Sequence, residues 1–410
     1  MINSINEVSQ IHNMKKRLYG TFQINGSLAL HSWYKYLAGF SAQFVLDSLE
    51  NYKIKPNDIV LDFFGGVGTT SVVCKKNNIK SISIELNPFP CFVAETKLNW
   101  NVNLDITISL LSILEKRQND YRTIKISKEN PLNKFFSEKI LKKLLFIKKY
   151  AINIKDEGIR NIFLLSLIKT LKPVSNCINF SPYFQYRAKK LKDAEVFEIF
   201  SDNLMDMVSD LRKVGKNKTF SKVICGDSKE EMKKIKSQSI DLVITSPPYL
   251  NNWDYSWITK LESLFLDYEL KEVRDKLVRS STYLLDKDDN SEECIIPNKK
   301  IKQEIGFLSK KLGKKKDNKS SKKFDVMVIS YFNDMYLILK EMERVMKKGS
   351  HSLVVLGDSG LYGIHVKTDE IIGKIGASLG LRLVNIEVLR KRSASRHKIP
   401  LRESIVIFKK

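Results

Sequence analysis

The 410-residue sequence predicts an α/β fold built on a mainly parallel sheet, and three features support this class. Short apolar runs, typical of buried strands, alternate with segments of helical periodicity in the N-terminal and C-terminal parts of the chain. A glycine-rich turn follows one such strand directly, and a Ser-Pro-Pro-Tyr turn follows another. Because open α/β sheets bind ligands at the carboxyl ends of their strands, we expect both turns to contribute to a site.

The glycine-rich turn follows the strand predicted over residues 58–62 and opens a helix at Thr69 and Thr70. Glycines allow a tight turn and a close approach of the backbone to a ligand, and the helix N-terminus offers unpaired N–H groups. A second strand, over residues 81–84, ends at Glu85, roughly 20 positions beyond the turn, where Rossmann-type sites place an acid that binds ribose hydroxyls. Alone, this pattern also fits a dinucleotide-dependent oxidoreductase.

The second turn, Ser246 to Tyr249, follows the apolar run 240–244, which predicts a buried strand. Pro247 and Pro248 fix φ twice and remove two N–H groups, so the turn presents mainly acceptors, including the Ser246 hydroxyl. Tyr249 adds a flat face on which a planar heterocycle can stack. These residues predict a pocket for the exocyclic amine of a base, although a purely structural proline turn is the alternative for this motif alone.

The two turns, taken together and in this order, resemble the amino-methyltransferases of DNA, which transfer a methyl group from S-adenosylmethionine to cytosine N4 or adenine N6. Segment 31–49 resembles the family's helix that precedes the glycine turn, segment 224–228 its third cofactor motif, and segment 401–408 its last strand. The resemblance implies a Rossmann-like methyltransferase fold, with a mainly parallel sheet, an antiparallel closing edge and, in this chain, a helical insertion.

The resemblance also implies S-adenosylmethionine as the cofactor and DNA with a flipped base as the substrate. The residues that it assigns to cofactor binding are Lys35, Tyr36, Asp62, Phe63, Phe64, Gly65, Gly66, Gly68, Thr69, Thr70, Glu85, Asp227 and Ser228. The catalytic residues that it implies are Ser246, Pro247, Pro248 and Tyr249. Neither a metal nor a covalent cysteine is needed for this chemistry.

Within the resemblance, serine at the first position of the Ser-Pro-Pro-Tyr motif favours cytosine N4 over adenine N6. Four alternatives remain open from the sequence. They are an adenine-N6 enzyme, an RNA methyltransferase, a nucleic-acid-binding module without activity, and the cofactor-dependent oxidoreductase.

Residues 1–100 are predicted to form the N-terminal cofactor-binding part and residues 220–410 the catalytic part of the core. Residues 101–219 have apolar side chains at helical spacing and are interpreted as a helical insertion that recognises the target. Within it, aromatic and cationic residues interleave over 180–190, which suits either base stacking or completion of the helical core. Segment 298–323 contains eleven lysines, and we interpret it as a mobile loop that contacts DNA phosphates.

The composition favours a polyanionic partner. Seventy Lys and Arg residues against 46 Asp and Glu residues give a formal charge of +24, which suits DNA and RNA alike because neutralised phosphates release counterions; double-stranded DNA is the partner that the resemblance implies. A cognate restriction endonuclease is a further candidate partner. No long apolar run or signal-peptide pattern occurs, so we expect a cytoplasmic protein without a membrane segment. Five scattered cysteines are expected to be free thiols, and neither they nor the five histidines have metal-ligand spacing.

Overall fold

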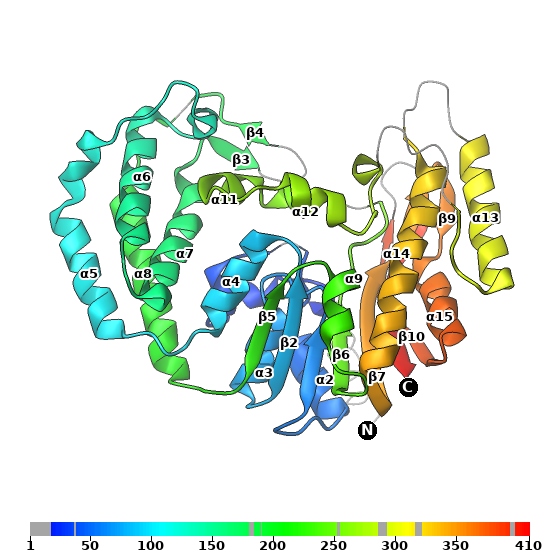
Figure 1. The fold of residues 1–410 in the computed structure, drawn as a ribbon. Helices are drawn as coiled ribbons and strands as arrows, with labels where there is room; N and C mark the ends of the chain where they lie inside the picture. Colours follow the sequence, from blue (N-terminus) through cyan, green and yellow to red (C-terminus); the bar gives the residue numbers. More distant parts are fainter. Residues whose placement is uncertain are drawn as a thin grey trace, which may run out of the picture.

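A seven-stranded sheet forms the centre of the protein in its computed structural model (Figure 1). The structure describes residues 18–36, 38–179, 184–189, 191–251, 255–285, 293–315, 322–393 and 398–410. The strand order is β10-β11-β7-β6-β1-β2-β5. The strands are β1 (Ile59–Asp62), β2 (Lys80–Glu85), β5 (Ser221–Cys225), β6 (Ile240–Thr245), β7 (Met346–Gly357), β10 (Arg382–Ser393) and β11 (Pro400–Lys409).

The sheet is parallel except for β11, which runs antiparallel to both of its neighbours, β7 and β10. The predicted fold class is therefore confirmed, including the antiparallel closing edge. Strand β1 pairs with β2 on one side and with β6 on the other, so the direction in which the chain builds the sheet reverses at β1. This reversal creates a topological switch point at the carboxyl ends of β1 and β6, where Asp62 and Thr245 lie.

Helices cover both faces of the sheet, because alternate strand residues point to opposite faces. Val60 of β1 joins a cluster with α2 (Ala42–Asn51) and α3 (Thr69–Lys76). Leu61 joins a cluster with α14 (Phe324–Val345) on the other face, and α15 (Thr368–Ser378) packs in the same cluster. Burial on both faces explains why these strands are almost continuously apolar.

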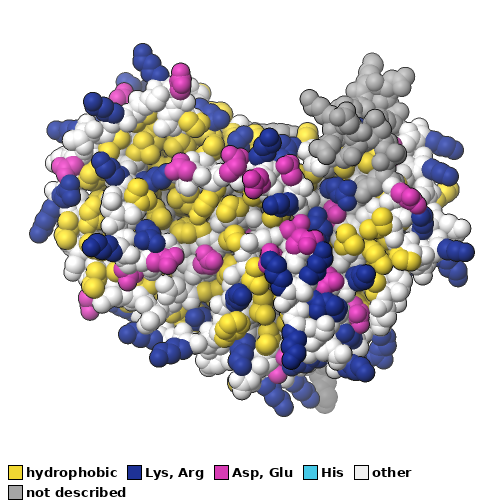
Figure 2. Space-filling model, viewed as in Figure 1, with side chains coloured by type: hydrophobic (Ala, Val, Ile, Leu, Met, Phe, Trp, Pro, Cys, Tyr) yellow, Lys and Arg dark blue, Asp and Glu magenta, His cyan; other side chains and the backbone are white. Residues whose placement is uncertain are grey.

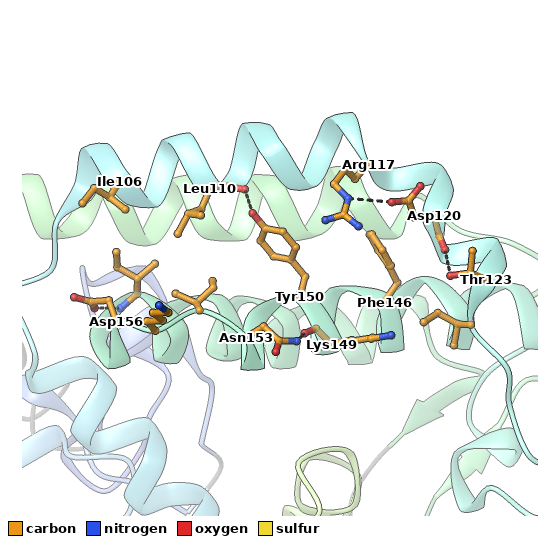
Figure 3. A pocket seen from close by; sticks show the side chains of 14 residues that line it. Ile106, Leu110, Arg117, Asp120, Thr123, Phe146, Lys149, Tyr150, Asn153 and Asp156 are labelled. Atoms are coloured by element: carbon orange, nitrogen blue, oxygen red, sulfur yellow. Dashed lines mark hydrogen bonds and ion pairs between the residues drawn. The ribbon is translucent and has the colours of Figure 1, made fainter.

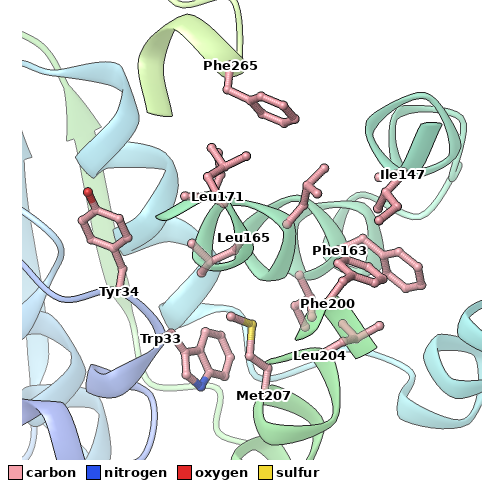
Figure 4. Packing of buried hydrophobic residues seen from close by; sticks show 14 of the residues in the cluster. Trp33, Tyr34, Ile147, Phe163, Leu165, Leu171, Phe200, Leu204, Met207 and Phe265 are labelled. Carbon is pink, nitrogen blue, oxygen red and sulfur yellow. The ribbon is translucent and has the colours of Figure 1, made fainter. Parts of the chain in front are cut away.

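Residues 101–219 are mainly helical, as expected. Their elements are α5 (Leu104–Lys116), η3 (Gln118–Thr123), η4 (Pro131–Lys134), α6 (Glu138–Ile152), α7 (Glu157–Val174), the hairpin of β3 (Cys177–Asn179) and β4 (Gln185–Tyr186), and α8 (Val196–Val214). They share one apolar core with α4 (Pro88–Leu98) and α11 (Lys260–Phe265). Figure 4 shows Trp33, from the N-terminal part, beside Met207 of α8 in this core. The insertion is thus joined to the sheet domain through shared packing.

Part of the predicted aromatic and cationic loop, residues 180–183 and 190, lies outside the described residues. Within the described part, Tyr186 is exposed on β4. Phe184 packs against Phe135, with ring centroids 5.0 Å apart, and against Trp257. Phe184 therefore serves the packing that the sequence left as one of two alternatives.

The remaining elements connect these parts and border the sheet. They are η1 (Ile24–Ser27), η2 (His31–Trp33), α9 (Ser228–Glu231), η5 (Met232–Lys234), α10 (Tyr255–Ile258), α12 (Lys271–Lys276), η6 (Thr282–Leu284), α13 (Lys299–Lys314), β8 (Ser359–Leu361) and β9 (Ile364–Val366).

The expectation of one helix over segment 31–49 is wrong. Helix η2 ends at Trp33, and α2 begins only after Ser41, whose hydroxyl accepts a hydrogen bond from the N–H of Phe44 at 3.1 Å. This side-chain cap starts a new helix, so Lys35 and Tyr36 lie in a non-helical link between the two.

The mobile-loop interpretation of segment 298–323 is also wrong for most of its length, because Lys299–Lys314 form helix α13. Asn298 caps this helix through its side chain. Its few apolar residues recur at helical spacing, and Ile301, Ile305 and Leu312 are buried against α14 and its surroundings. The many lysines made the segment look too polar to fold, but its narrow apolar face is sufficient to pack the helix against α14. Residues 316–321 lie outside the described part.

The expectation that all five cysteines are free thiols is wrong for one pair. Cys91 and Cys225 form a disulfide with their Cα atoms 5.9 Å apart, whereas Cys74, Cys177 and Cys294 are buried outside this bond. Strand β5 pairs with β2, and α4 begins just after β2, so residues 134 positions apart in the chain become neighbours. The spacing of the cysteines in the sequence does not reveal this pairing.

Substitutions on α13 test whether the helix is packed. Ile305→Ala should lower the free energy of unfolding by about 2–5 kcal/mol, because Ile305 is fully buried and its loss leaves a cavity. Phe307→Ala, on the same helix but with a side chain 70% exposed, should change it by less than about 0.5 kcal/mol. Urea unfolding of both variants measures the difference. Equal effects would contradict the packing described for α13.

Candidate active site

The carboxylate of Asp62 joins the glycine-rich turn to the Ser-Pro-Pro-Tyr turn. One oxygen accepts a hydrogen bond from the Thr70 hydroxyl at 2.7 Å, and the other accepts from the Thr245 hydroxyl at 2.9 Å and from the N–H of Phe64 at 3.2 Å. Burial raises the pKa of Asp62 to about 6, although these hydrogen bonds oppose the shift. Asp62 therefore fixes the geometry of the site from beneath it.

A cavity opens where the ends of β1, β2, β5 and β6 meet. The predicted site residues that line it are Tyr36, Phe64, Gly66, Glu85, Asp227, Ser228, Ser246 and Pro248. The structure thus brings cofactor-motif residues and base-motif residues to one place. Lys35, Asp62, Phe63, Gly65, Gly68, Thr69, Thr70, Pro247 and Tyr249 do not line this cavity.

The cavity has further lining residues that the sequence motifs did not indicate, namely Ala38, Leu86, Lys276, Leu277 and Val278, and Tyr255, which follows the Ser-Pro-Pro-Tyr turn, lines it as well. Residues 276–278 lie at the end of the short helix α12 and just beyond it, and they approach the site from the catalytic part of the chain. The open volume of the cavity, about 70 Å³, is smaller than that of typical ligand pockets, so side chains must shift for a cofactor to enter. The motifs carry no signal for these residues, because only the fold brings them to the site.

The glycines of the first turn are required by the backbone and by their neighbours. Gly66 has a positive φ of +50°, and a Cβ atom there would lie 3.1 Å from the Tyr36 ring. A Cβ atom at Gly65 would lie 1.8 Å from the Ser83 hydroxyl oxygen. Side chains at either position would therefore displace the turn or close the cavity.

Glu85 is the acid predicted for the ribose, and its carboxylate is held by backbone donors. One oxygen accepts from the N–H of Gly66 at 2.9 Å, and the other accepts from the N–H of Asn87 at 2.8 Å. Each oxygen retains a second lone pair, so the donor set fits a diol such as ribose. Burial raises the pKa of Glu85 to about 7.

The third cofactor motif lies beside Glu85, at the end of β5. Asp227 caps α9, and burial raises the pKa of its carboxyl group. The Ser228 hydroxyl donates a hydrogen bond to the carbonyl of Phe63, which connects this loop to the end of β1. Two acids and the Phe64 ring thus surround one cavity, a set that suits the hydroxyls, amino group and flat ring of an adenosine.

The Ser-Pro-Pro-Tyr turn forms the other wall. Ser246 and Pro248 line the cavity, while the hydroxyl of the adjoining Tyr249 donates to Glu403 of β11 at 2.8 Å. Burial and the Glu403 carboxylate raise the pKa of Tyr249 well above its ordinary value. Residues 252–254, which follow shortly after, lie outside the described part.

A larger cavity of about 740 Å³ lies elsewhere, within the helical insertion. Figure 3 shows it between α5 and the α6 region, where the Tyr150 hydroxyl donates to the carbonyl of Leu110. Its lining contains none of the residues of the two turns. We therefore assign the chemistry to the smaller cavity at the strand ends, which contains both sets of motif residues.

The chain is similar to known methyltransferases. Residues 21–95 match the family model of DNA methylases of the N6_N4 type, a stretch that contains the glycine turn and Glu85. The Type II methyltransferase M.BsoBI of Geobacillus stearothermophilus is 23% identical, with 99% of this chain and 90% of the relative covered. The Type II methyltransferase M.AvaI of a Nostoc species is 22% identical, with 93% and 85% covered.

A solved structure, the rRNA methyltransferase aviRa from Streptomyces viridochromogenes, is 8% identical and matches with 93% of this chain and 91% of that chain covered. The TM-score between the two structures is only 0.29. The family model and the relatives support a Type II DNA methyltransferase of the N4/N6 amino-methyltransferase family. S-adenosylmethionine is the methyl donor of that family.

No described helix has the length and apolar character needed to span a membrane. No cluster of three or more His, Cys, Asp or Glu side chains suited to a metal ion occurs in the described ranges.

The raised pKa of Glu85 predicts how cofactor affinity depends on pH. The ionised carboxylate accepts ribose hydroxyls better, so below about pH 7 a proton must leave on binding. Affinity for S-adenosylhomocysteine should therefore rise about tenfold from pH 6 to pH 8, by the ionised fraction. Isothermal titration calorimetry measures it.

Two variants serve as controls for this pH dependence. Glu85→Gln should bind more weakly at every pH and with a flat profile, whereas Asp227→Asn should retain the slope between pH 6 and pH 8. An affinity of the unsubstituted protein that does not change over this range would contradict the role of Glu85.

Proposed function

We propose that the protein transfers a methyl group to the N4 amine of a cytosine in double-stranded DNA, after the base has been flipped out of the duplex. The observation that supports this proposal is the convergence of Glu85, Asp227 and Ser246 on one cavity. An adenosine held by the two acids would direct its reactive end towards the acceptor turn. A cofactor-dependent oxidoreductase would have no use for that turn.

Residues of the Ser-Pro-Pro-Tyr turn make the exocyclic amine more nucleophilic. The lone pair of an exocyclic amine is delocalised into the ring, which makes it a poor nucleophile. The Ser246 hydroxyl and the Pro247 carbonyl accept the two N–H groups and draw the nitrogen towards tetrahedral geometry, which localises the lone pair. Bound S-adenosylmethionine supplies an electrophilic methyl group on a positively charged sulfur. Catalysis is then mainly the positioning of the amine, with Tyr249 stacked on the base.

The choice of cytosine rests on serine at the first position of the motif. Adenine N6 is the second candidate, because the same acceptors suit both amines. RNA would be a third, although the named relatives are Type II methyltransferases, a class that acts on DNA. A cognate restriction endonuclease would then be the partner in the cell, and the cytoplasm the place of action.

The surface supports a nucleic-acid partner. Figure 2 shows Lys and Arg side chains scattered over the visible face, on the helical insertion and on the opposite side alike, with hydrophobic and acidic side chains between them. We assign target recognition to the insertion, residues 101–219, and phosphate contacts to α13. A Cβ atom at Gly313, near the end of α13, would lie 3.6 Å from Asp325 at the start of α14. Because α14 runs directly into β7, this end of α13 lies at the carboxyl edge of the sheet, as the site does.

The methylated base is the first test of this proposal. Purified protein with S-adenosylmethionine and DNA, followed by digestion to nucleosides and mass spectrometry, should yield N4-methylcytosine. Ser246→Ala should lower the turnover about 10- to 100-fold while cofactor affinity stays unchanged, since this hydroxyl faces the amine. N6-methyladenine alone would refute the choice of cytosine but retain the mechanism. Methylation of RNA in preference to DNA would refute the choice of DNA.

The lysines of α13 provide the second test. Replacing Lys310, Lys311 and Lys314 by Gln should weaken binding to all DNA sequences alike and reduce the log-log salt slope by about one per lost phosphate contact. The matched control replaces Lys53, Lys55 and Lys348, which are exposed near the opposite edge of the sheet. Fluorescence anisotropy over a salt series measures both. A changed target sequence with an unchanged slope would show that α13 contacts bases instead.

A further inference from the structure

Three cross-strand neighbours form a row behind Tyr249. Arg390 of β10 is paired with Glu403 of β11, and Glu403 is paired with Gly357 of β7. Gly357 has no side chain, and a Cβ atom there would lie 2.9 Å from Cδ2 of Tyr249. The Arg392 guanidinium, which lies nearer still, and the Tyr249 ring therefore share the space that a side chain at position 357 would fill, and the ring reaches from there to the next strand.

Glu403 accepts a hydrogen bond from the hydroxyl of the Tyr249 ring. Its side chain is 1% exposed, and one carboxylate oxygen accepts the Tyr249 hydroxyl at 2.8 Å. The other oxygen accepts from Nε of Arg390. A Cβ atom at Gly20 would lie 2.8 Å from Cδ of Glu403, so the N-terminal part closes over the carboxylate. The Glu403 carboxylate is thus held in place by the pairing of its strand, by the Arg390 guanidinium and by close packing.

We propose that Glu403 is a positioning residue for methyl transfer, which acts by holding the Tyr249 ring in the orientation that a flipped base requires. This inference rests on the proposed function, since it needs Tyr249 to stack on the base. Pro248 fixes the main chain at one end of Tyr249, and the hydrogen bond to Glu403 fixes the hydroxyl at the other. With both ends held, the ring loses its rotational freedom before the base arrives.

The contacts of Glu403 exclude a role as general base for this carboxylate. The contacts of Tyr249 restrict the face of its ring on which the flipped nucleobase can stack. Both oxygens of Glu403 already accept hydrogen bonds from protein groups, the Tyr249 hydroxyl and Nε of Arg390. The guanidinium of Arg392 lies over the Tyr249 ring, 5.8 Å from its centroid. A base that stacks on Tyr249 must therefore use the opposite face of the ring.

A double-mutant cycle tests the proposal with Tyr249→Phe, Glu403→Gln and the combined variant. Tyr249→Phe keeps the stacking ring and removes only the hydroxyl. Each single change should lower kcat about tenfold, the scale of a hydrogen bond to a charged group, with the KM for cofactor unchanged. The double variant should be no slower than the slower single variant, because both changes act on the same hydrogen bond, which Tyr249→Phe removes and which Glu403→Gln deprives of its charged acceptor.

Ser404→Ala is the matched control. Ser404 is buried next to Glu403 on β11, and its hydroxyl donates to Asp369 at 2.8 Å. Its loss removes one buried hydrogen bond from the same strand without affecting Tyr249, so it should lower stability but leave kcat unchanged. A kcat for Ser404→Ala as low as that of Glu403→Gln would show a general effect of strand damage and overturn the proposal.

Urea unfolding of the same variants separates the possible failures. Non-additive free energies of unfolding for Tyr249→Phe and Glu403→Gln, together with non-additive kcat values, are the expected result. Additive unfolding energies would show that the hydrogen bond does not form, and unchanged kcat values would limit it to a structural role; either overturns the proposal. If the unsubstituted protein transferred no methyl group to DNA, the proposed function would fall and the positioning role with it.

Discussion

The buried carboxylate of Asp62 is the constraint on which the site depends. It ends β1, accepts the Thr70 hydroxyl of the helix that follows the glycine turn, and accepts the Thr245 hydroxyl that precedes the Ser-Pro-Pro-Tyr turn. Strands β1 and β6 are neighbours but are separated by 183 positions between Asp62 and Thr245. This one side chain therefore sets the distance between the turn that would hold the cofactor and the turn that would hold the amine.

A second set of contacts fixes the site from the far side of β6. Tyr249 passes over Gly357 to Glu403, and Ser359, which follows β7, donates to the carbonyl of Leu250. The Ser-Pro-Pro-Tyr turn is thus held at its start by Asp62 and at its end by β7 and β11. Such support on both sides suits a site whose chemistry depends mainly on orientation.

Much of this arrangement could be predicted from the sequence, because local patterns determined it. The apolar run before Ser246 and the glycines before Thr69 indicated strands followed by ligand-binding turns, and both turns lie where a parallel sheet places them. Glu85 was predicted from its spacing alone. It lies at the end of the strand beside β1, with its carboxylate against the glycine turn.

The rest depends on contacts between distant segments or on weak patterns. Glu403 is one of three charged residues of strand β11, and only the pairing with β7 shows that it meets Tyr249. The Cys91–Cys225 bond requires the pairing of β2 with β5. Helix α13 was missed because its apolar face is narrow and its lysines dominate the composition. For Glu403 and the disulfide, the residues that decide the contact are distant in the sequence.

Single-molecule sequencing of DNA from cells that express the protein tests the central claim most directly, since it reports both the modified base and its sequence context. We predict one short target sequence with methylated cytosine in cells that express the unsubstituted protein, and no modification with Tyr249→Ala. Unmodified DNA in the presence of a folded protein that binds S-adenosylmethionine would contradict the account, as would equal modification by the Tyr249→Ala variant.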